Sequence, residues 1–293
     1  MQLVILAAGH GRRFGGLKQL APVGPSGEAI MDYTALAAEA CGFSGIIVVV
    51  REEIRAEVAH HVGRRWPSNL PVEYVCQPPV PGTAQALLCT RPLVDGPFGV
   101  ANADDLYGEA ALRLIVEHLS PGVDASPHVL VAYHLARTVL TAATVTRGLC
   151  EVGEDVLLRR VAEHRVSRRD DGSFDAVPLG QAGPPDAAGS DLAGPLLLAG
   201  DEPVSMNLFG FRPRLFDELD EAVRRFDPET AVRPELLLPD VVGSLVGPGS
   251  DQVAVVTTEN RCIGITHRED VAIVRDEIVR ESAHLEALRA AQI

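Results

Sequence analysis

The chain contains almost no lysine. Its 293 residues include 26 basic side chains, and Lys18 is the single lysine among them. Arginine serves wherever this sequence needs a positive charge of any shape. Position 18 therefore indicates a need for a compact ammonium, which differs from the wide, planar guanidinium. Genome-wide depletion of lysine is the alternative explanation, and the count alone does not separate the two.

Three further absences narrow the class of protein. The five cysteines are scattered, with an odd total and no C-x-x-C pair, which argues against a disulfide framework and a structural zinc site. No apolar run approaches the roughly 20 residues of a membrane span, and no basic segment of a secretory signal follows Met1. The net charge of −14 disfavours nucleic acid and anionic membranes as partners. We expect a cytoplasmic protein that captures anionic substrates through local cations and backbone amides.

Strand-like and helix-like segments alternate through the first half of the chain. The predicted strands lie at residues 3–6, 46–50, 72–76 and 98–101, and the predicted helices at 30–41, 52–65, 83–91 and 109–119. This alternation predicts an α/β fold with a largely parallel sheet and helices on both faces. Substrate then belongs at the carboxyl ends of the strands.

The second half has a different pattern. From about 129 to 177 the helical period fades, and short β-like runs predict added strands. Residues 178–195 are rich in Gly, Pro, Ala and Asp and predict a flexible surface loop. Further predicted elements are a strand at 204–211, a helix at 214–225, short strands at 253–257 and 262–265, and a charged helix from about 268. We find no internal repeat and no clean boundary between independent domains.

A glycine-rich loop follows the first apolar run. Glycines without Cβ atoms let successive N–H groups approach an anion, which is what a phosphate cradle needs. A Walker loop is excluded because Leu17 separates Gly16 from Lys18, and Gln19 follows the lysine. A dinucleotide fingerprint starting at Gly9 is excluded because its third glycine would fall on Phe14.

The motif L-A-A-G-x-G-x-R, followed by K-x-L-x-P, resembles the signature of sugar-1-phosphate nucleotidyltransferases, or nucleotide-sugar pyrophosphorylases. The first motif spans Leu6 to Arg13 and the second spans Lys18 to Pro22. The resemblance implies a three-layer α/β/α, Rossmann-like nucleotide-diphospho-sugar transferase fold with a mostly parallel mixed sheet. It also implies that Arg13 and Lys18 are catalytic cations, and that the triphosphate is wrapped by Leu6, Ala7, Ala8, Gly9 and Gly11. The alternative is a glycine-rich surface turn with solvated charges.

A second segment resembles the part of the same family that reads the nucleobase. It places Gln77, Gly82 and Thr83 in the nucleotide site. An amide offers a donor and an acceptor together, so Gln77 could pair with a pyrimidine imide, and Gly82 would let the base approach the main chain. The alternative is a loop-to-helix junction in which Thr83 is the N-cap.

Paired acids end the fourth predicted strand. A carboxylate at a strand's carboxyl end can hold Mg²⁺ against phosphate oxygens, and the resemblance implies this role for Asp104, with Asp105 beside it among the sugar-binding residues. Asp105 could instead cap the helix that starts at Glu109. A second metal-binding aspartate is expected near 262–266, where the chain has none, and the sequence does not rank the substitutes Asp201, Asp240 and Asp270.

Downstream segments resemble the family's sugar-binding segments in matching order, and they imply Gly148, Glu163 and Asn207 as sugar-binding residues. Where the family has E-K-P, this chain has Glu163-His164-Arg165, which leaves the cation for the sugar phosphate open, with Arg165 as a substitute.

The resemblance implies one catalytic domain over 1–267, with a nucleotide-binding half (about 1–125) and a sugar-binding half (about 126–267). A C-terminal helix at 268–293 would pack on the same domain. The expected enzyme is Mg²⁺-dependent and joins a nucleoside triphosphate, UTP or dTTP favoured, to a sugar-1-phosphate, glucose-1-phosphate favoured. The alternatives are a cytidylyltransferase acting on another phosphorylated acceptor, a glycosyltransferase on a similar fold, and a non-catalytic regulatory domain. A homo-oligomer stays open.

Overall fold

The computed structural model describes residues 1–11, 13–78, 82–119, 127–141, 143–179, 195–231, 234–246 and 252–291, with side chains described up to 280. Four parallel strands form the N-terminal part of an 11-stranded sheet, in the order β4, β1, β2, β3. They are β1 (Gln2–Leu6), β2 (Gly45–Val50), β3 (Val72–Cys76) and β4 (Phe98–Asn102). β2 is buried along its whole length, as expected for a parallel strand covered on both faces.

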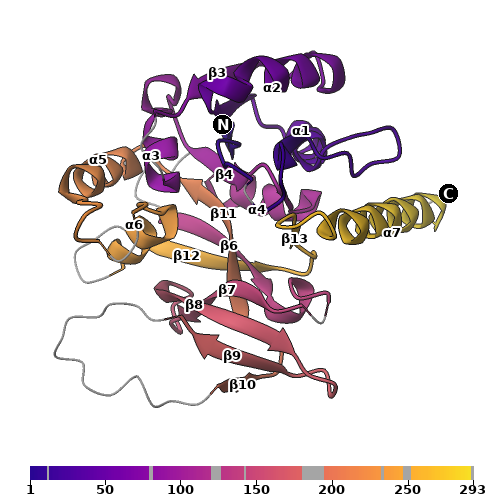
Figure 1. The fold of residues 1–293 in the computed structure, drawn as a ribbon, viewed down its shortest axis with the longest axis vertical. Helices are drawn as coiled ribbons and strands as arrows, with labels where there is room; N and C mark the ends of the chain where they lie inside the picture. The colour runs from indigo at the N-terminus through magenta and orange to yellow at the C-terminus, as the bar shows by residue number, and fades with distance from the viewer. Residues whose placement is uncertain are drawn as a thin grey trace.

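Helices cover both faces of this sheet. One core contains Leu3 and Ile5 of β1 with the apolar faces of α1 (Ile30–Ala40), α2 (Glu52–Arg65) and α4 (Glu109–Leu119). The other contains Val4 and Leu6 with α3 (Thr83–Leu88), α5 (Leu215–Arg225) and α6 (Leu238–Ser244), which lie together on the left of Figure 1. Alternate residues of β1 thus pack into two separate cores, one on each face of the sheet. The predicted three-layer α/β/α fold is confirmed.

Antiparallel strands extend the sheet in the second half of the chain. β11 (Pro203–Phe211) pairs antiparallel with β4, β6 and β7, so it joins the two halves. The other strands here are β6 (His128–His134), β7 (Val145–Val152), β8 (Leu158–Arg168), β9 (Phe174–Pro178), β10 (Leu196–Leu198) and β12 (Val253–Thr258). β12 is the exception among them, because it pairs with β6 in parallel. The loop predicted at 178–195 lies, from 180 to 194, outside the described residues.

The C-terminal segment returns to the N-terminal half. β13 (Ile263–Gly264) pairs antiparallel with β5 (Asp105–Leu106), and α7 (Asp270–Ala291) follows. A third, smaller core packs Val274 and Ile278 of α7 with Leu106 and Val23. Figure 1 shows α7 running outward from β13 beside α1. None of the helices in the described part of the chain has the length and apolar character that a membrane crossing requires.

Candidate functional site

The glycine-rich loop leaves β1 at Leu6 and closes in a tight turn. Gly11 adopts a left-handed φ of +59°, and a Cβ there would lie 2.5 Å from the carbonyl oxygen of Gly16. The N–H groups of Phe14 and Gly15 both donate to the Gly11 carbonyl, at 3.0 and 2.9 Å. Gly9 differs, because a Cβ there would meet its nearest neighbours only at 3.8 Å. The fold therefore requires glycine at position 11 but not at position 9.

Two side chains that the sequence analysis missed hold the predicted nucleotide-binding residues Ala7, Ala8 and Gly9 in place. The buried Gln19 amide donates to the carbonyls of Ala7 and Gly9, at 2.9 and 2.6 Å. Arg51 donates through Nε to the Ala8 carbonyl at 2.9 Å. The backbone of the loop is therefore held in place by hydrogen bonds from Gln19 and Arg51 to its carbonyl groups. Gln19 falls on the variable position of K-x-L-x-P, so the motif itself gave no signal for it.

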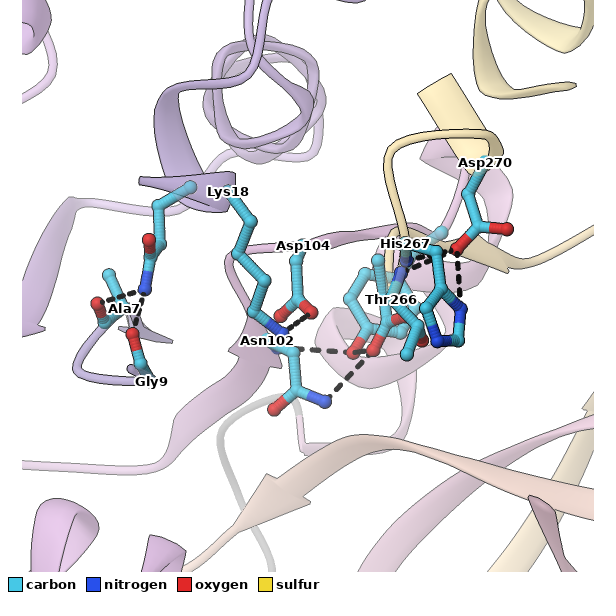
Figure 2. Close-up of polar contacts among 11 residues, drawn as sticks. Ala7, Gly9, Lys18, Asn102, Asp104, Thr266, His267 and Asp270 are labelled. Atoms are coloured by element: carbon cyan, nitrogen blue, oxygen red, sulfur yellow. Dashed lines mark hydrogen bonds and ion pairs between the residues drawn. The ribbon is translucent and has the colours of Figure 1, made fainter. Parts of the chain in front are cut away.

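Lys18 and Asp104 meet at the edge of the sheet, although 86 positions separate them in sequence. Lys18 begins the short 3-10 helix η1 (Lys18–Leu20), and Asp104 follows β4. The strand ends pair at Leu6 and Asn102, which brings the two segments together. The Lys18 ammonium donates to the Asp104 carboxylate, and the two side chains are 21% and 20% exposed. Figure 2 shows this pair beside Asn102.

The other predicted catalytic cation, Arg13, is exposed on the loop. Within the described residues no hydrogen bond or ion pair joins Arg13 to Lys18 or Asp104.

Asp105 is buried next to Asp104 and faces inward. Its carboxylate accepts from the Asn102 amide at 2.9 Å, and the Tyr107 hydroxyl lies 3.3 Å from the same oxygen. Burial first, and the charge of Asp104 second, raise the pKa of the Asp105 carboxyl to about 6. Both of these contacts are with groups at the end of β4 and next to β5, and neither is with a backbone N–H of α4.

Gly264 stands opposite Asp105 in the register where a second metal-binding aspartate was expected. A Cβ at Gly264 would lie 2.1 Å from Oδ1 of Asp105, so the carboxylate fills the space of a side chain at 264. The next residue, Ile265, donates its N–H to the Asp104 carbonyl at 2.9 Å. β13 therefore packs directly against the acidic pair.

Of the three substitute acids, only Asp270 lies on this segment. Its carboxylate accepts the N–H groups of Thr266 and His267, both at 2.7 Å (Figure 2). Asp240 accepts from the Leu237 N–H at the start of α6, and the Asp201 carbonyl lies 2.9 Å from Nδ1 of His134. Within the described ranges, no three His, Cys, Asp or Glu side chains gather in a way that could hold a metal ion.

The predicted base-reading residues are joined to one another and to α6. The Gln77 amide donates to the Gly82 carbonyl at 3.0 Å. Gly82 has a φ of +123°, and a Cβ there would lie 2.3 Å from the Leu236 carbonyl oxygen, so this glycine makes room for a neighbouring chain segment. Gly82 is the N-cap of α3 and Thr83 is the first helical residue, so the reading of Thr83 as N-cap is wrong. The Thr83 hydroxyl accepts the Leu238 N–H at 2.7 Å.

Apart from Asp105, the predicted sugar-binding residues lie on adjoining antiparallel strands. Gly148 of β7 pairs with Glu163 of β8 on one side and with Ser205 of β11 on the other. Asn207 lies in an irregularity of β11 with a left-handed φ of +59°, and its N–H donates to the Ser205 hydroxyl at 3.2 Å. Such a backbone costs a non-glycine residue about 1 kcal/mol or more, and asparagine tolerates it best.

Tyr107 links these strands to the acidic pair. Its hydroxyl donates to the Met206 carbonyl at 2.9 Å and accepts the Asn102 N–H at 3.0 Å. The residue before Asn207 and the end of β4 are thereby held by one buried side chain. Nothing in the motif distinguishes Tyr107 from a core aromatic residue, so this link could not be predicted from it.

The C-terminal segment also clamps the glycine-rich loop. Arg268 donates to the carbonyls of Phe14 and Gly15, at 3.0 and 3.2 Å, and its guanidinium lies 5.4 Å from the centre of the Phe14 ring. A contact between residues 14 and 268 spans most of the chain, and the spacing of the motifs gives no sign of it.

Comparison with known proteins gives the family. No curated protein matches this sequence. Among solved structures, the inositol-1-phosphate CTP transferase from T. maritima is similar in fold, with a TM-score of 0.63 and 14% sequence identity over 94% of this chain and 95% of that chain. A model of the MobA-like NTP transferase domain matches residues 3–224, and the glycine-rich loop, Lys18 and the acidic pair all lie within this range. The chain therefore belongs to the MobA-like NTP transferase family, whose members are nucleotidyltransferases.

Proposed function

We propose that this protein transfers a nucleotidyl group from a nucleoside triphosphate to a phosphorylated acceptor. A phosphate oxygen of the acceptor attacks the α-phosphorus in line, and pyrophosphate leaves. The observation that carries the proposal is the meeting of Lys18 and Asp104 at the joined ends of β1 and β4, next to the glycine-rich loop. A phosphate nucleophile is already ionised at neutral pH, so this chemistry needs positioning and charge neutralisation and no general base.

Asp104 suits a magnesium ion. Mg²⁺ usually takes one or two protein carboxylates and completes its shell with water and substrate phosphates, and the partly exposed carboxylate of Asp104 can supply one of them. When bound, the ion would neutralise negative charge on the triphosphate oxygens. Lys18 would hold a compact positive charge beside the transferring phosphate, while Gln19 and Arg51 keep the loop backbone in place.

The antiparallel strands would hold the acceptor. Glu163 can accept hydrogen bonds from acceptor hydroxyls, and Asn207 can orient the same ring. Arg165 alternates with Glu163 along β8 and therefore shares its face, where its exposed guanidinium could meet the acceptor phosphate. This arrangement suits a polyhydroxylated phosphate ester such as a sugar-1-phosphate.

For the finer specificity we favour UTP or dTTP with glucose-1-phosphate. Gln77 and the motif resemblance support this pairing. A second candidate, CTP with a polyol phosphate such as inositol-1-phosphate, is favoured by the fold likeness to the inositol-1-phosphate CTP transferase. Both candidates use the same phosphate chemistry and differ in the base and the acceptor ring.

The test measures pyrophosphate release with Mg²⁺ across all pairings of the common triphosphates with sugar-1-phosphates and inositol-1-phosphate. We expect turnover that is greatest for UTP or dTTP with glucose-1-phosphate. Preference for CTP with inositol-1-phosphate would select the second candidate. No turnover in any pairing, with nucleotide-sugar binding intact, would replace catalysis by a regulatory role. Where the same assay is applied to a variant without the site cation, such as Lys18→Ala, Arg91→Gln is the matched control. Arg91 forms an exposed ion pair with Asp217 away from the loop.

A further inference from the structure

A polar hollow lies away from the glycine-rich loop and the acidic pair. It has a volume of about 680 Å³ and is bounded by the short helix η3 (Leu135–Arg137), the end of β8 and the first turns of α7. Its charged lining residues are Arg137, Arg168, Arg261, Arg280, Asp276 and Glu277. None of them belongs to the glycine-rich loop or the acidic pair, and among them only Arg168, the last residue of β8, lies on a strand proposed to hold the acceptor. The volume is in the usual range of small-molecule sites.

The charge of this hollow is opposite to that of the whole chain. Four arginines and two acids line it, whereas the chain carries a net charge of −14. The two acids do not neutralise the four arginines evenly, because the buried Glu277 forms ion pairs with two of them. Its carboxylate lies 3.0 Å from Arg261 and also pairs with Arg280. The α7 side of the hollow is therefore a fixed network around one buried acid.

Arg137 and Arg168, on the wall opposite α7, are held less firmly by acidic side chains than Arg261 and Arg280 are. Arg137 lies 3.6 Å from Glu259, whose side chain is 80% exposed, and such exposed pairs contribute little. The guanidinium of Arg168 lies 6.0 Å from the centre of the Phe174 ring, at the outer limit of a cation–π contact, and no acid of the described residues forms an ion pair with it. Both cations can therefore turn their N–H groups toward a ligand at small cost.

We propose that this hollow binds a phosphorylated small molecule at a site separate from the catalytic one. Planar guanidinium forks match phosphate oxygens with paired hydrogen bonds, which lysine does not offer. Leu140 and Ile273 add an apolar wall, which suits a ligand that carries a ring beside its phosphate. The phosphates would lie on Arg137 and Arg168, and the rest of the ligand along α7. The proposal does not depend on which nucleotidyl transfer the protein performs.

The test uses isothermal titration calorimetry with UDP and with inorganic pyrophosphate, in buffer with EDTA. The variants are Arg137→Gln/Arg168→Gln, which leaves the Glu277 network intact, and Lys18→Met, which removes the cation of the catalytic site. The matched control is Arg159→Gln/Arg169→Gln, which removes two exposed arginines from the β8 region that pair with Asp155 and Asp175 outside the hollow. Thermal melting of each protein checks that the fold is retained.

We expect two binding events in the wild-type protein and in the control. The Arg137→Gln/Arg168→Gln variant should lose one of them, with affinity reduced roughly tenfold or more. Lys18→Met should keep that same event and weaken the other. The proposal is overturned if Lys18→Met abolishes all binding, if the Arg137→Gln/Arg168→Gln variant binds like the wild type, or if the wild type binds neither probe more tightly than about 1 mM.

Discussion

The two halves of the sheet build their parts of the site in different ways. In the parallel half, the glycine-rich loop and the acidic pair simply follow the ends of β1 and β4, and the pairing of Leu6 with Asn102 places them side by side. In the antiparallel half, Gly148, Glu163 and Ser205 become neighbours only through the register of three strands. Local motifs therefore encode the first half, whereas the second depends on long-range pairing. Substitutions should test this contrast, and the largest effects should come from the parallel half.

Lys18 should be the most sensitive position. Lys18→Arg keeps the charge but replaces a compact ammonium that fits against Asp104 with a wide fork. We expect kcat for pyrophosphate release to fall about a hundredfold or more, the usual effect of losing one group that stabilises transition-state charge. Lys18→Ala should be at least as poor. If Lys18→Arg instead keeps near-full activity, the lone lysine reflects composition and not chemistry.

Asp105 should reveal its burial through pH. Its carboxyl pKa is raised from 3.8 to about 6, so the folded state holds the proton more tightly and the contribution of Asp105 to stability falls as pH rises from about 4 to about 6. Asp105→Asn cannot ionise and should escape this loss. Without divalent cations, we expect the variant to be more stable by on the order of 2 to 3 kcal/mol at pH 8, and by almost nothing near pH 4.

Urea unfolding at several pH values measures this difference. Asp171→Asn is the control, because the exposed Asp171 has its pKa lowered by hydrogen bonds from Ser173, and its removal should bring no gain at pH 8. A wild-type and an Asp105→Asn protein with parallel pH profiles would show that Asp105 is not penalised by burial.

The two glycines of the loop should separate folding from binding. Gly11→Ala places a Cβ 2.5 Å from the Gly16 carbonyl on a left-handed backbone, and we expect a loss of about 1 to 2 kcal/mol of unfolding free energy. Gly9→Ala finds only contacts of 3.8 Å, so the melting temperature should not change. If Gly9 faces the triphosphate, Gly9→Ala should still raise KM for the nucleotide. Equal destabilisation by both would contradict the different roles of these glycines.

The same contrast explains what the sequence could predict. The α/β/α layers followed from strand and helix periodicity, and the motifs at strand ends assigned Lys18 and Asp104 to one site without predicting that the two side chains pair. Arg268 and Tyr107 were missed because they act across 254 and 99 positions, through carbonyl groups that any residue provides. The Gly82 prediction identified a necessary glycine, yet the neighbour that fills its space is the Leu236 backbone, which no pattern of side chains marks.

Glu163 tests the antiparallel half with the smallest expected effect. Glu163 pairs with Gly148 across β7 and β8, and a Cβ added at Gly148 would lie 2.8 Å from the Val161 side chain. The position of the Glu163 carboxylate therefore depends on the register of these two strands. Glu163→Gln keeps the shape and exchanges a charged acceptor for a neutral one, which weakens a hydrogen bond by about 1 kcal/mol. We expect KM for the phosphorylated acceptor to rise roughly fivefold, while KM for the triphosphate and the melting temperature stay unchanged. Glu151→Gln, at an exposed position of β7 paired with Arg160, is the matched control and should change none of them. A rise in KM for the triphosphate instead would mean that the two halves do not divide the substrates, and that the contrast between them concerns folding alone.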